Sequence, residues 1–327
     1  MALIVGGLQF QTSPTTAFDY DSEKQELWEN ASSLAYVMNQ LIALARPHQY
    51  IKNGFVFLGV LFAGHWDWPA LLNALLVFLA FCAMASAVYI FNDIADLASD
   101  QLHPVKRNRP LASGAVSVRA GWGLATGMAV LAMAFAAPVG GWALFLLAVY
   151  ALINIAYSIK LKHVVVLDVF IIATGFMLRI LAGTIGLGIA PSSWLLLCGL
   201  MLTLFLGFAK RRAELLMLER AGLRDRALTR RVLDDYTPII IEQFMSISAA
   251  CAILTYGLYT VSEDTVSRHG TDNLIYSLPF VVYGTFRYIY LLHSKGKGND
   301  TARDVYSDPH MLLTMAGWLA IVVMVLA

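Results

Sequence analysis

The chain has 327 residues, of which 58% are hydrophobic and 14% are charged, and its mean hydropathy is +0.65. Soluble domains carry about 25% charged residues, so this composition excludes an ordinary soluble fold and indicates an all-α, polytopic membrane protein. The formal net charge of +1 gives no sign of a nucleic-acid partner.

Apolar segments with helical character follow one another along the chain. After a polar, acidic tail, residues 34–47 have apolar residues at helical spacing, and we expect this segment to lie on the membrane surface and to end at Pro47. The stretch 137–141 predicts either a tight turn between two spans or a break within one. Nine candidate spans follow the tail, at about residues 53–64, 70–91, 120–139, 141–157, 164–187, 191–209, 238–261, 273–292 and 310–327.

This division predicts a cytoplasmic tail with an interfacial helix over residues 1–43 and a helical transmembrane domain over residues 44–327. The basic residues predict its orientation. Of the 23 Lys and Arg residues, all but Arg179, Arg268 and Arg287 lie in the tail or in every second connection between spans. The positive-inside rule places those connections in the cytoplasm. We therefore expect a multi-pass protein of the inner (plasma) membrane with its active site facing the cytoplasm.

The stretch NDIADLASD, residues 92–100, places three aspartates at the end of an apolar helix. Asp93, Asp96 and Asp100 are three and four residues apart, so on a helix they share one face and repel one another. A divalent cation would remove this repulsion, and Mg2+ prefers a few carboxylates together with water and phosphate oxygens. We expect these acids to be catalytic and, with Asn92, to bind Mg2+ or alternatively Mn2+. The competing interpretation is a solvated helix end with scattered acids.

Basic residues follow the acids and recur on the other cytoplasmic connections. Acids for a metal followed by bases for phosphate indicate a phosphotransfer or diphosphate-leaving reaction. Arginine binds phosphate through two parallel hydrogen bonds, and lysine supplies a point charge. The candidate substrate-binding residues are Arg46, Lys52, Asn53, Lys106, Arg107, Arg109, Tyr157, Lys160, Lys162, Lys210, Arg211 and Glu214.

These motifs resemble those of the UbiA-type prenyltransferase superfamily, intramembrane helical-bundle enzymes that bind a diphosphate through Mg2+. NDIADLASD matches the NDxxDxxxD motif of that superfamily. Members that prenylate aromatic rings carry a second aspartate-rich motif after the sixth span, where this chain has GFAKRRAELLMLERAG (207–222). The chain is instead similar to the decaprenyl-phosphate phosphoribosyltransferase branch, through ARPHQYIKN (45–53), NDIADLASDQLHPVKRNRPLASG (92–114), YSIKLKHVVVLDV (157–169) and GFAKRRAEL (207–215).

The resemblance implies a glycosyl transfer, in which 5-phosphoribose moves from phosphoribosyl diphosphate to a polyprenyl phosphate lipid and diphosphate is released. The lipid phosphate is already anionic, so no strong general base is needed. Asp168, an acid inside the fifth span, would contact ribose hydroxyls or pair with a lysine. Glu214 would orient Lys210 or Arg211, or contact a ribose hydroxyl. An oligomer is compatible with the sequence.

Two other functions stay open at this point. One is an intramembrane prenyltransferase that moves a prenyl group from prenyl diphosphate to an aromatic acceptor, and the basic replacement at 210–214 argues against it. The other is a transporter or channel for an anionic metabolite. Against it, the charges gather at one face of the membrane and do not line a path across it.

Overall fold

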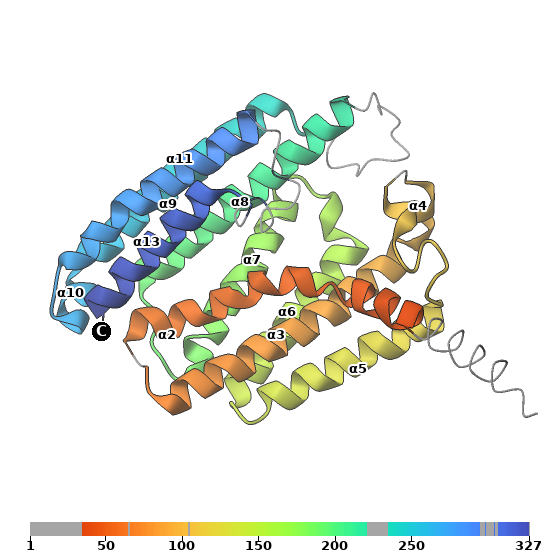
Figure 1. The fold of residues 1–327 in the computed structure, drawn as a ribbon, viewed down its shortest axis with the longest axis horizontal. Coiled ribbons are helices and arrows are strands. Elements are labelled where there is room, and N and C mark those ends of the chain that lie inside the picture. Colours follow the sequence, from red (N-terminus) through yellow and green to blue (C-terminus); the bar gives the residue numbers. More distant parts are fainter. Residues whose placement is uncertain are drawn as a thin grey trace, which may run out of the picture.

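Long helices, joined by short helical connections, form a bundle (Figure 1). The computed structural model describes residues 35–64, 66–103, 105–220, 235–294, 298, 304 and 307–326, so most of the predicted tail lies outside the described residues. Within these ranges every regular element is helical, which confirms the all-α prediction. The long helices are α3 (Trp68–Ala95), α5 (Val118–Ala136), α6 (Gly141–Ile159), α7 (Leu167–Ala182), α8 (Ser193–Arg220), α9 (Pro238–Val261), α11 (Leu278–Ser294) and α13 (Pro309–Leu326).

All nine apolar runs become helical, but two of them differ from the predicted spans. The first run forms a 3-10 helix, η1 (Pro47–Val56), and a short helix, α2 (Phe57–Ala63), which ends at Gly64 in the left-handed conformation. The eighth run opens with a 3-10 helix, η6 (Asn273–Ser277), before α11. Among the described residues, seven helices are long and apolar enough to cross a membrane by length and composition. The polytopic helical prediction is confirmed, with nine as an approximate number of membrane helices.

Capping residues and glycines set the helix boundaries. The side chains of Asp67, Ser117 and Thr237 accept hydrogen bonds from the first turns of α3, α5 and α9. Gly140, with a φ of 133°, allows the tight turn between α5 and α6. Residues 137–141 therefore form a turn between two helices, which resolves the alternative left open by the sequence.

Glycines also let η1 and α2 pack closely against α7. A Cβ atom added to Gly59 would lie 1.9 Å from the carbonyl oxygen of Gly183, and one added to Gly183 would lie 1.8 Å from the carbonyl oxygen of Val56. Only residues without a side chain fit at such a backbone-to-backbone contact. This contact fixes η1, and with it the N-terminal part of the site, on the surface of α7.

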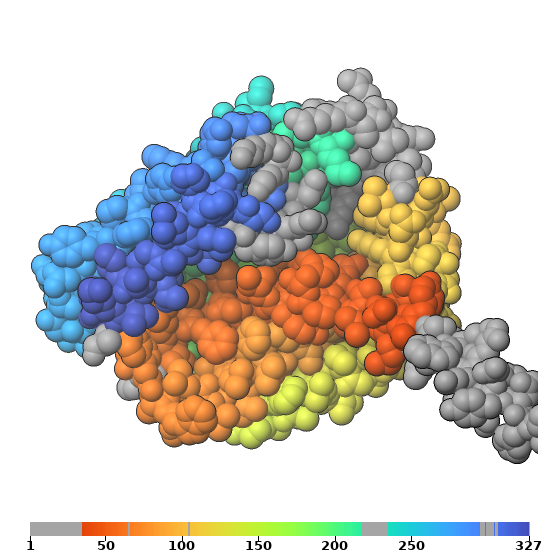
Figure 2. Space-filling view, in the orientation of Figure 1, coloured from red at the N-terminus to blue at the C-terminus, as the bar shows by residue number. Residues whose placement is uncertain are grey.

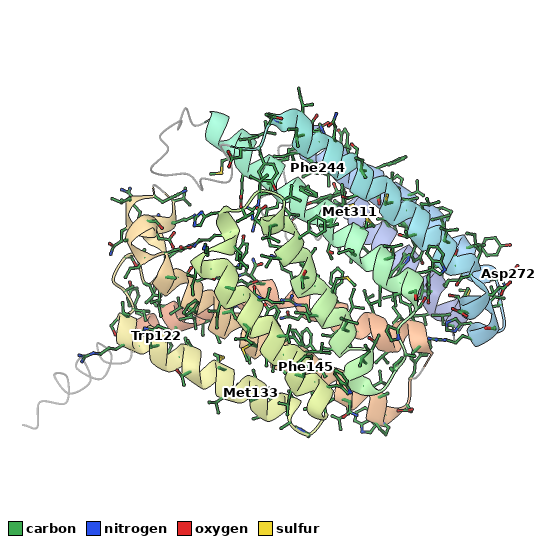
Figure 3. All side chains as sticks on the ribbon, turned by 180° about the vertical axis from the view of Figure 1, so that it is seen from behind. Trp122, Met133, Phe145, Phe244, Asp272 and Met311 are labelled. Carbon is green, nitrogen blue, oxygen red and sulfur yellow. The ribbon has the colours of Figure 1, made fainter. Side chains whose placement is uncertain are left out.

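The outer surface of the bundle is apolar, as a lipid-facing surface requires. For example, Trp122 and Met133 on α5 and Phe145 on α6 are exposed on the face seen in Figure 3. At the opposite end of the chain, α13 lies beside α2 (Figure 2), where the rings of Trp318 and Phe62 are 6.0 Å apart. The helix α2, near the N-terminal end of the described chain, therefore packs against the last helix, α13.

The segment before Pro47 is helical over residues 35–45, as the sequence predicted, and ends before Arg46, which has a φ of 56°. Leu44 is buried in a small core with Ile90 and Leu111, while Tyr36 and neighbouring apolar residues are exposed. The helix therefore docks on α3 by one face. Its contact with the membrane surface, like the domain boundary at residue 43, stays a prediction.

Candidate active site

Most of the predicted site residues gather at one end of the bundle. They lie at the C-terminal end of α3, on the short helix α4 (Leu97–Leu102), on the 3-10 helices η2 (Lys106–Asn108) and η3 (Leu161–His163), and near the C-terminal end of α8. In Figure 1 this is the end occupied by α4, while the α5–α6 turn and α10 (Glu263–His269) lie away from it. Connections far apart in sequence thus meet, as the alternation of spans predicted.

Asp93, in the last turn of α3, is buried and binds two arginines. Both of its carboxylate oxygens accept hydrogen bonds from Nη2 of Arg46, at 2.6 and 2.7 Å, and Oδ1 also accepts from Nη1 of Arg109 at 3.0 Å. The left-handed backbone of Arg46 turns its guanidinium toward α3, where it also lies 5.3 Å from the ring centroid of Tyr89. These contacts offset part of the cost of burying the carboxylate.

The other two aspartates also bind bases. Oδ2 of Asp100, which is buried, accepts a hydrogen bond from the same Nη1 atom of Arg109 at 2.6 Å, and Nζ of Lys106 is 4.0 Å from Oδ1. Asp96 faces Nζ of Lys162, from η3. Its other oxygen accepts a hydrogen bond from Nδ2 of Asn92 at 3.2 Å. The acids and bases predicted from the sequence therefore meet in space. We call them the first cluster, which comprises Asn92, Asp93, Asp96, Asp100, Arg46, Lys106, Arg109 and Lys162.

The expected shared face of the three acids needs correction. The helix is interrupted at Asp96, because α3 ends at Ala95, α4 begins at Leu97 and Asp96 itself has φ and ψ of −92° and 3°. Asp93 and Asp100 are still bridged by one nitrogen of Arg109, but Asp96 points toward η3. The repulsion between the acids is offset by basic side chains from other connections.

The oxygen-rich cluster suits a hard divalent cation. Carboxylates with an amide oxygen nearby are ligand types that Mg2+ accepts. No three acidic, histidine or cysteine side chains already converge as a metal site in the described part of the chain. Instead, Nη1 of Arg109 lies between Asp93 and Asp100 and supplies the positive charge that a metal would supply. The residues fit Mg2+ in chemistry, and its binding would require the bases to take other partners.

A histidine shapes the loop that carries these bases. Nδ1 of His103 accepts hydrogen bonds from the backbone amides of Val105, at 3.2 Å, and Lys106, at 3.3 Å. Burial lowers the pKa of His103, and the positive charge of Lys106 lowers it further. The neutral imidazole therefore folds the loop so that Lys106 and Arg109 lie next to Asp100.

A second ionic cluster lies beside the first, at the cytoplasmic ends predicted for α6, α7 and α8. Nε of Arg211 is 2.7 Å from Oδ2 of Asp168, and both side chains are fully buried. Nη1 of Arg211 donates to the carboxylate of Glu214, and Nη2 donates to the hydroxyl of Tyr157 at 3.1 Å. The partner of Asp168 is thus an arginine, where the sequence suggested a lysine, because α7 and α8 pack side by side.

This geometry can be compared with known proteins. Residues 54–315 match the family model described as the UbiA prenyltransferase family. The chain belongs to the UbiA prenyltransferase family. The family resemblance predicted from the motifs is confirmed, and the protein is a transferase. With its apolar helices it is a multi-pass membrane protein.

Several UbiA relatives cover most of the chain. The decaprenyl-phosphate phosphoribosyltransferase of Corynebacterium glutamicum is 30% identical over 319 residues, which are 95% of this chain and 91% of the relative. The protein of the same name from Mycolicibacterium smegmatis is 34% identical over 233 residues, which are 70% of this chain and 72% of the relative. A solved UbiA homolog from Archaeoglobus fulgidus bound to GPP and Mg2+ has a TM-score of 0.66 at 18% identity, over 88% of this chain and 99% of that chain. This last likeness shows the shared fold.

Not every predicted residue of this UbiA protein joins the two clusters. Asn53 is buried, where Oδ1 accepts a hydrogen bond from Nε of Arg179 at 2.6 Å. Arg179 also donates to the carbonyl of Gly175, within its own helix, and to the hydroxyl of Tyr150. The predicted contact of Asn53 with substrate stays a prediction.

The remaining predicted bases differ in exposure. Arg107 and Lys160 are exposed and form no ion pair with a described residue. Lys52 and Lys210 are half-buried, and each has polar or electrostatic contacts. The exposed bases remain available to a charged molecule at this end of the bundle.

The sequence analysis missed one residue of the second cluster. The hydroxyl of Tyr236, just before α9, donates to Oδ1 of Asp168 at 2.9 Å. Burial raises the pKa of Tyr236, and the charge of Asp168 raises it further. No local pattern marks Tyr236, because the two residues are 68 positions apart and meet only through helix packing.

Proposed function

We propose that this protein transfers 5-phosphoribose from phosphoribosyl diphosphate to a polyprenyl phosphate of the decaprenyl type and releases diphosphate. The proposal is carried by the pairing of Arg211 with Asp168 and Glu214. It lies where an aromatic prenyltransferase would carry its second aspartate-rich motif. Arg211 has no acceptor atom, so it cannot bind a metal where a second metal site would need a carboxylate. The names of the C. glutamicum and M. smegmatis relatives support the same reaction.

The two substrates carry a diphosphate and two phosphates, and the site offers several bases. We assign Arg46, Arg109 and Lys162 to the diphosphate, because they already surround the aspartates. The exposed Arg107 and Lys160 are suited to the 5-phosphate or the lipid phosphate. The remaining assigned substrate contacts are Lys52, Asn53, Lys106, Tyr157, Lys210, Arg211 and Glu214.

The residues of the first cluster account for departure of the diphosphate. Asp93, Asp96 and Asp100, with Asn92, would hold Mg2+ or Mn2+, which supplies positive charge to the leaving group when bound. Arg109 and Lys162 then donate charge-assisted hydrogen bonds to diphosphate oxygens. The bond from the anomeric carbon to the diphosphate breaks while a lipid phosphate oxygen bonds to that carbon from the opposite face, with inversion. The phosphate is already ionised, so no residue has to remove a proton from it.

The location of the site fits a soluble donor and a lipid acceptor. The positive-inside rule supports a site that faces the cytoplasm from the inner (plasma) membrane. Phosphoribosyl diphosphate would enter from the cytoplasm, whereas the polyprenyl phosphate would arrive from the bilayer. We assign this reaction to the transmembrane domain of residues 44–327.

A reconstitution in detergent tests the proposal. The purified protein is mixed with Mg2+, phosphoribosyl diphosphate and decaprenyl phosphate, and the ribosylated lipid and released diphosphate are measured. A parallel mixture contains a prenyl diphosphate and an aromatic acceptor. We expect product only in the first mixture, and EDTA should abolish it. Prenyl transfer in the second mixture, without any ribosylated lipid in the first, would replace this proposal with the aromatic prenyltransferase.

A matched pair of variants links the activity to the first cluster. Asp93→Asn should reduce transfer by at least two orders of magnitude, because the loss of one ligand and one charge weakens both metal and base binding. Asp272→Asn changes an exposed acid far from the site (Figure 3) and should leave the rate unchanged. Equal rates in the two variants would remove Asp93 from the mechanism.

A further inference from the structure

Tyr236, just before α9, contacts the start of α7 through a buried hydroxyl. Its side chain is 4% exposed, and its hydroxyl oxygen accepts a hydrogen bond from the backbone amide of Val166 at 2.7 Å. The same hydroxyl donates to Oδ1 of Asp168 at 2.9 Å. Phenylalanine has a similar shape but no hydroxyl to donate or accept a hydrogen bond, so it could satisfy neither partner.

The backbone around Val166 is held in an unusual conformation. Val166 has a φ of 68°, which a β-branched residue rarely adopts and which persists only where surrounding contacts impose it. Its amide points at Tyr236 and the following turn starts α7, which carries Asp168. The position of Asp168 therefore depends on the hydroxyl of Tyr236.

Asp168 in turn fixes Arg211 from its buried side. With Oδ1 bound to Tyr236, Oδ2 faces Nε of Arg211 at 2.7 Å. The other end of the guanidinium donates to Tyr157 and Glu214, and the side chain of Glu214 is 24% exposed. The contacts thus connect the fully buried Asp168 to the carboxylate of Glu214, which a ligand can reach.

We propose that Tyr236 is a positioning residue for the sugar donor, acting through Asp168 and Arg211 to hold Glu214 as the acceptor of a pentose hydroxyl. This inference rests on the proposed function. A carboxylate has two oxygens and accepts several hydrogen bonds, so Glu214 can accept from Arg211 and from a sugar hydroxyl together. A prenyl chain has no hydroxyl to offer, so this carboxylate favours a sugar diphosphate over a prenyl diphosphate.

Two tyrosines on one segment provide a matched test. Tyr236→Phe removes the hydroxyl of this relay. Tyr256→Phe removes an equally buried hydroxyl, bound to Ser277 and Trp318, which lies nearly six helical turns further along toward the other end of α9. The KM of phosphoribosyl diphosphate should rise about tenfold in Tyr236→Phe alone, as expected for the loss of an oriented hydrogen bond to the donor. The KM of the lipid acceptor should stay within twofold in both variants.

A double-mutant cycle separates positioning from general stability. If Tyr236 acts through Glu214, then Glu214→Gln should raise the donor KM by itself, and adding Tyr236→Phe should raise it little further. The inference would be overturned if the two substitutions had additive effects on the donor KM. It would also be overturned if Tyr236→Phe and Tyr256→Phe changed the donor KM equally. Should Tyr236→Phe fail to fold, an unchanged donor KM in Glu214→Gln would overturn it alone.

The wild-type protein distinguishes this inference from the function on which it rests. Absence of ribosyl transfer by the wild type would defeat both. Normal wild-type transfer with no change of donor KM in the variants would defeat only the positioning role of Tyr236.

Discussion

Replacing Arg109 with glutamine should destabilise the first cluster, because its guanidinium pairs with two buried carboxylates. Nη1 of Arg109 is 2.6 Å from Asp100 and 3.0 Å from Asp93, and the two carboxylates are only 3% and 2% exposed. A hydrogen bond to a charged group contributes about 1.5–3 kcal/mol, and the 28% exposure of Arg109 reduces this through solvent screening. We therefore expect Arg109→Gln to lower the free energy of unfolding by about 2–4 kcal/mol in the absence of Mg2+.

The same variant should respond more strongly to metal than the wild type does. Without the guanidinium between them, Asp93 and Asp100 repel each other, and Mg2+ relieves that repulsion by binding both. Thermal unfolding of the purified protein in detergent, measured across a Mg2+ titration, would reveal this as a larger rise in melting temperature for Arg109→Gln. EDTA should reverse the rise.

A neighbouring arginine supplies the control. Arg107 lies on the same 3-10 helix, is exposed and makes no ion pair with a described residue, so Arg107→Gln should leave the melting temperature and its metal dependence unchanged. If Arg107→Gln and Arg109→Gln are equally stable and respond equally to Mg2+, the bridging role of Arg109 and the metal site inferred from it are both refuted.

Two further predictions concern packing and pH. Gly183→Ala should destabilise the protein by about 1–3 kcal/mol, because the new Cβ would lie 1.8 Å from the carbonyl oxygen of Val56. Gly127→Ala on α5 is the control, because its Cβ would meet nothing within 4 Å. Equal melting temperatures of the two variants would contradict the contact between Gly183 and Val56. The lowered pKa of His103 means that its contribution to stability is present above pH 6.5 and is lost as the pH falls through the folded-state pKa. Melting temperatures from pH 8 to 5 should therefore fall more steeply for wild type than for His103→Gln, and parallel curves would exclude this histidine.

Local sequence features were sufficient for most of the helices and for the pairing of Asp100 with Arg109. Apolar runs depend on neighbouring residues, so most helices could be predicted closely, whereas the turn at Gly140 was one of two alternatives that the sequence left open. Asp100 and Arg109 are nine residues apart, and the loop between them folds back on itself. The meeting of acids and bases could therefore be predicted from their order along the chain.

The details of the contacts depend on packing, which local features do not specify. The helix is interrupted at Asp96, whose side chain pairs with Lys162, 66 residues away in the sequence. Arg211 and Arg212 are consecutive on α8, so their side chains point about 100° apart. Arg211 faces Asp168 on α7, whereas Arg212 binds Glu242 on α9 at 2.9 Å. Consecutive basic residues thus pair with acidic residues on different helices.

The pairing of acids with bases also explains how a metal and a diphosphate could share this site. Asp93 and Asp100 are buried, and in the protein alone Arg46 and Arg109 are their positively charged partners. If metal bound alone, it would take the carboxylates and leave Arg46 and Arg109 without an anion. If diphosphate bound alone, it would take the arginines and leave the carboxylates without a cation. When both arrive, the metal binds the carboxylates and the diphosphate binds the bases, so the number of opposite-charge contacts is kept. Each should therefore raise the affinity for the other, and removing Arg109 should weaken this coupling by opening the carboxylates to metal alone.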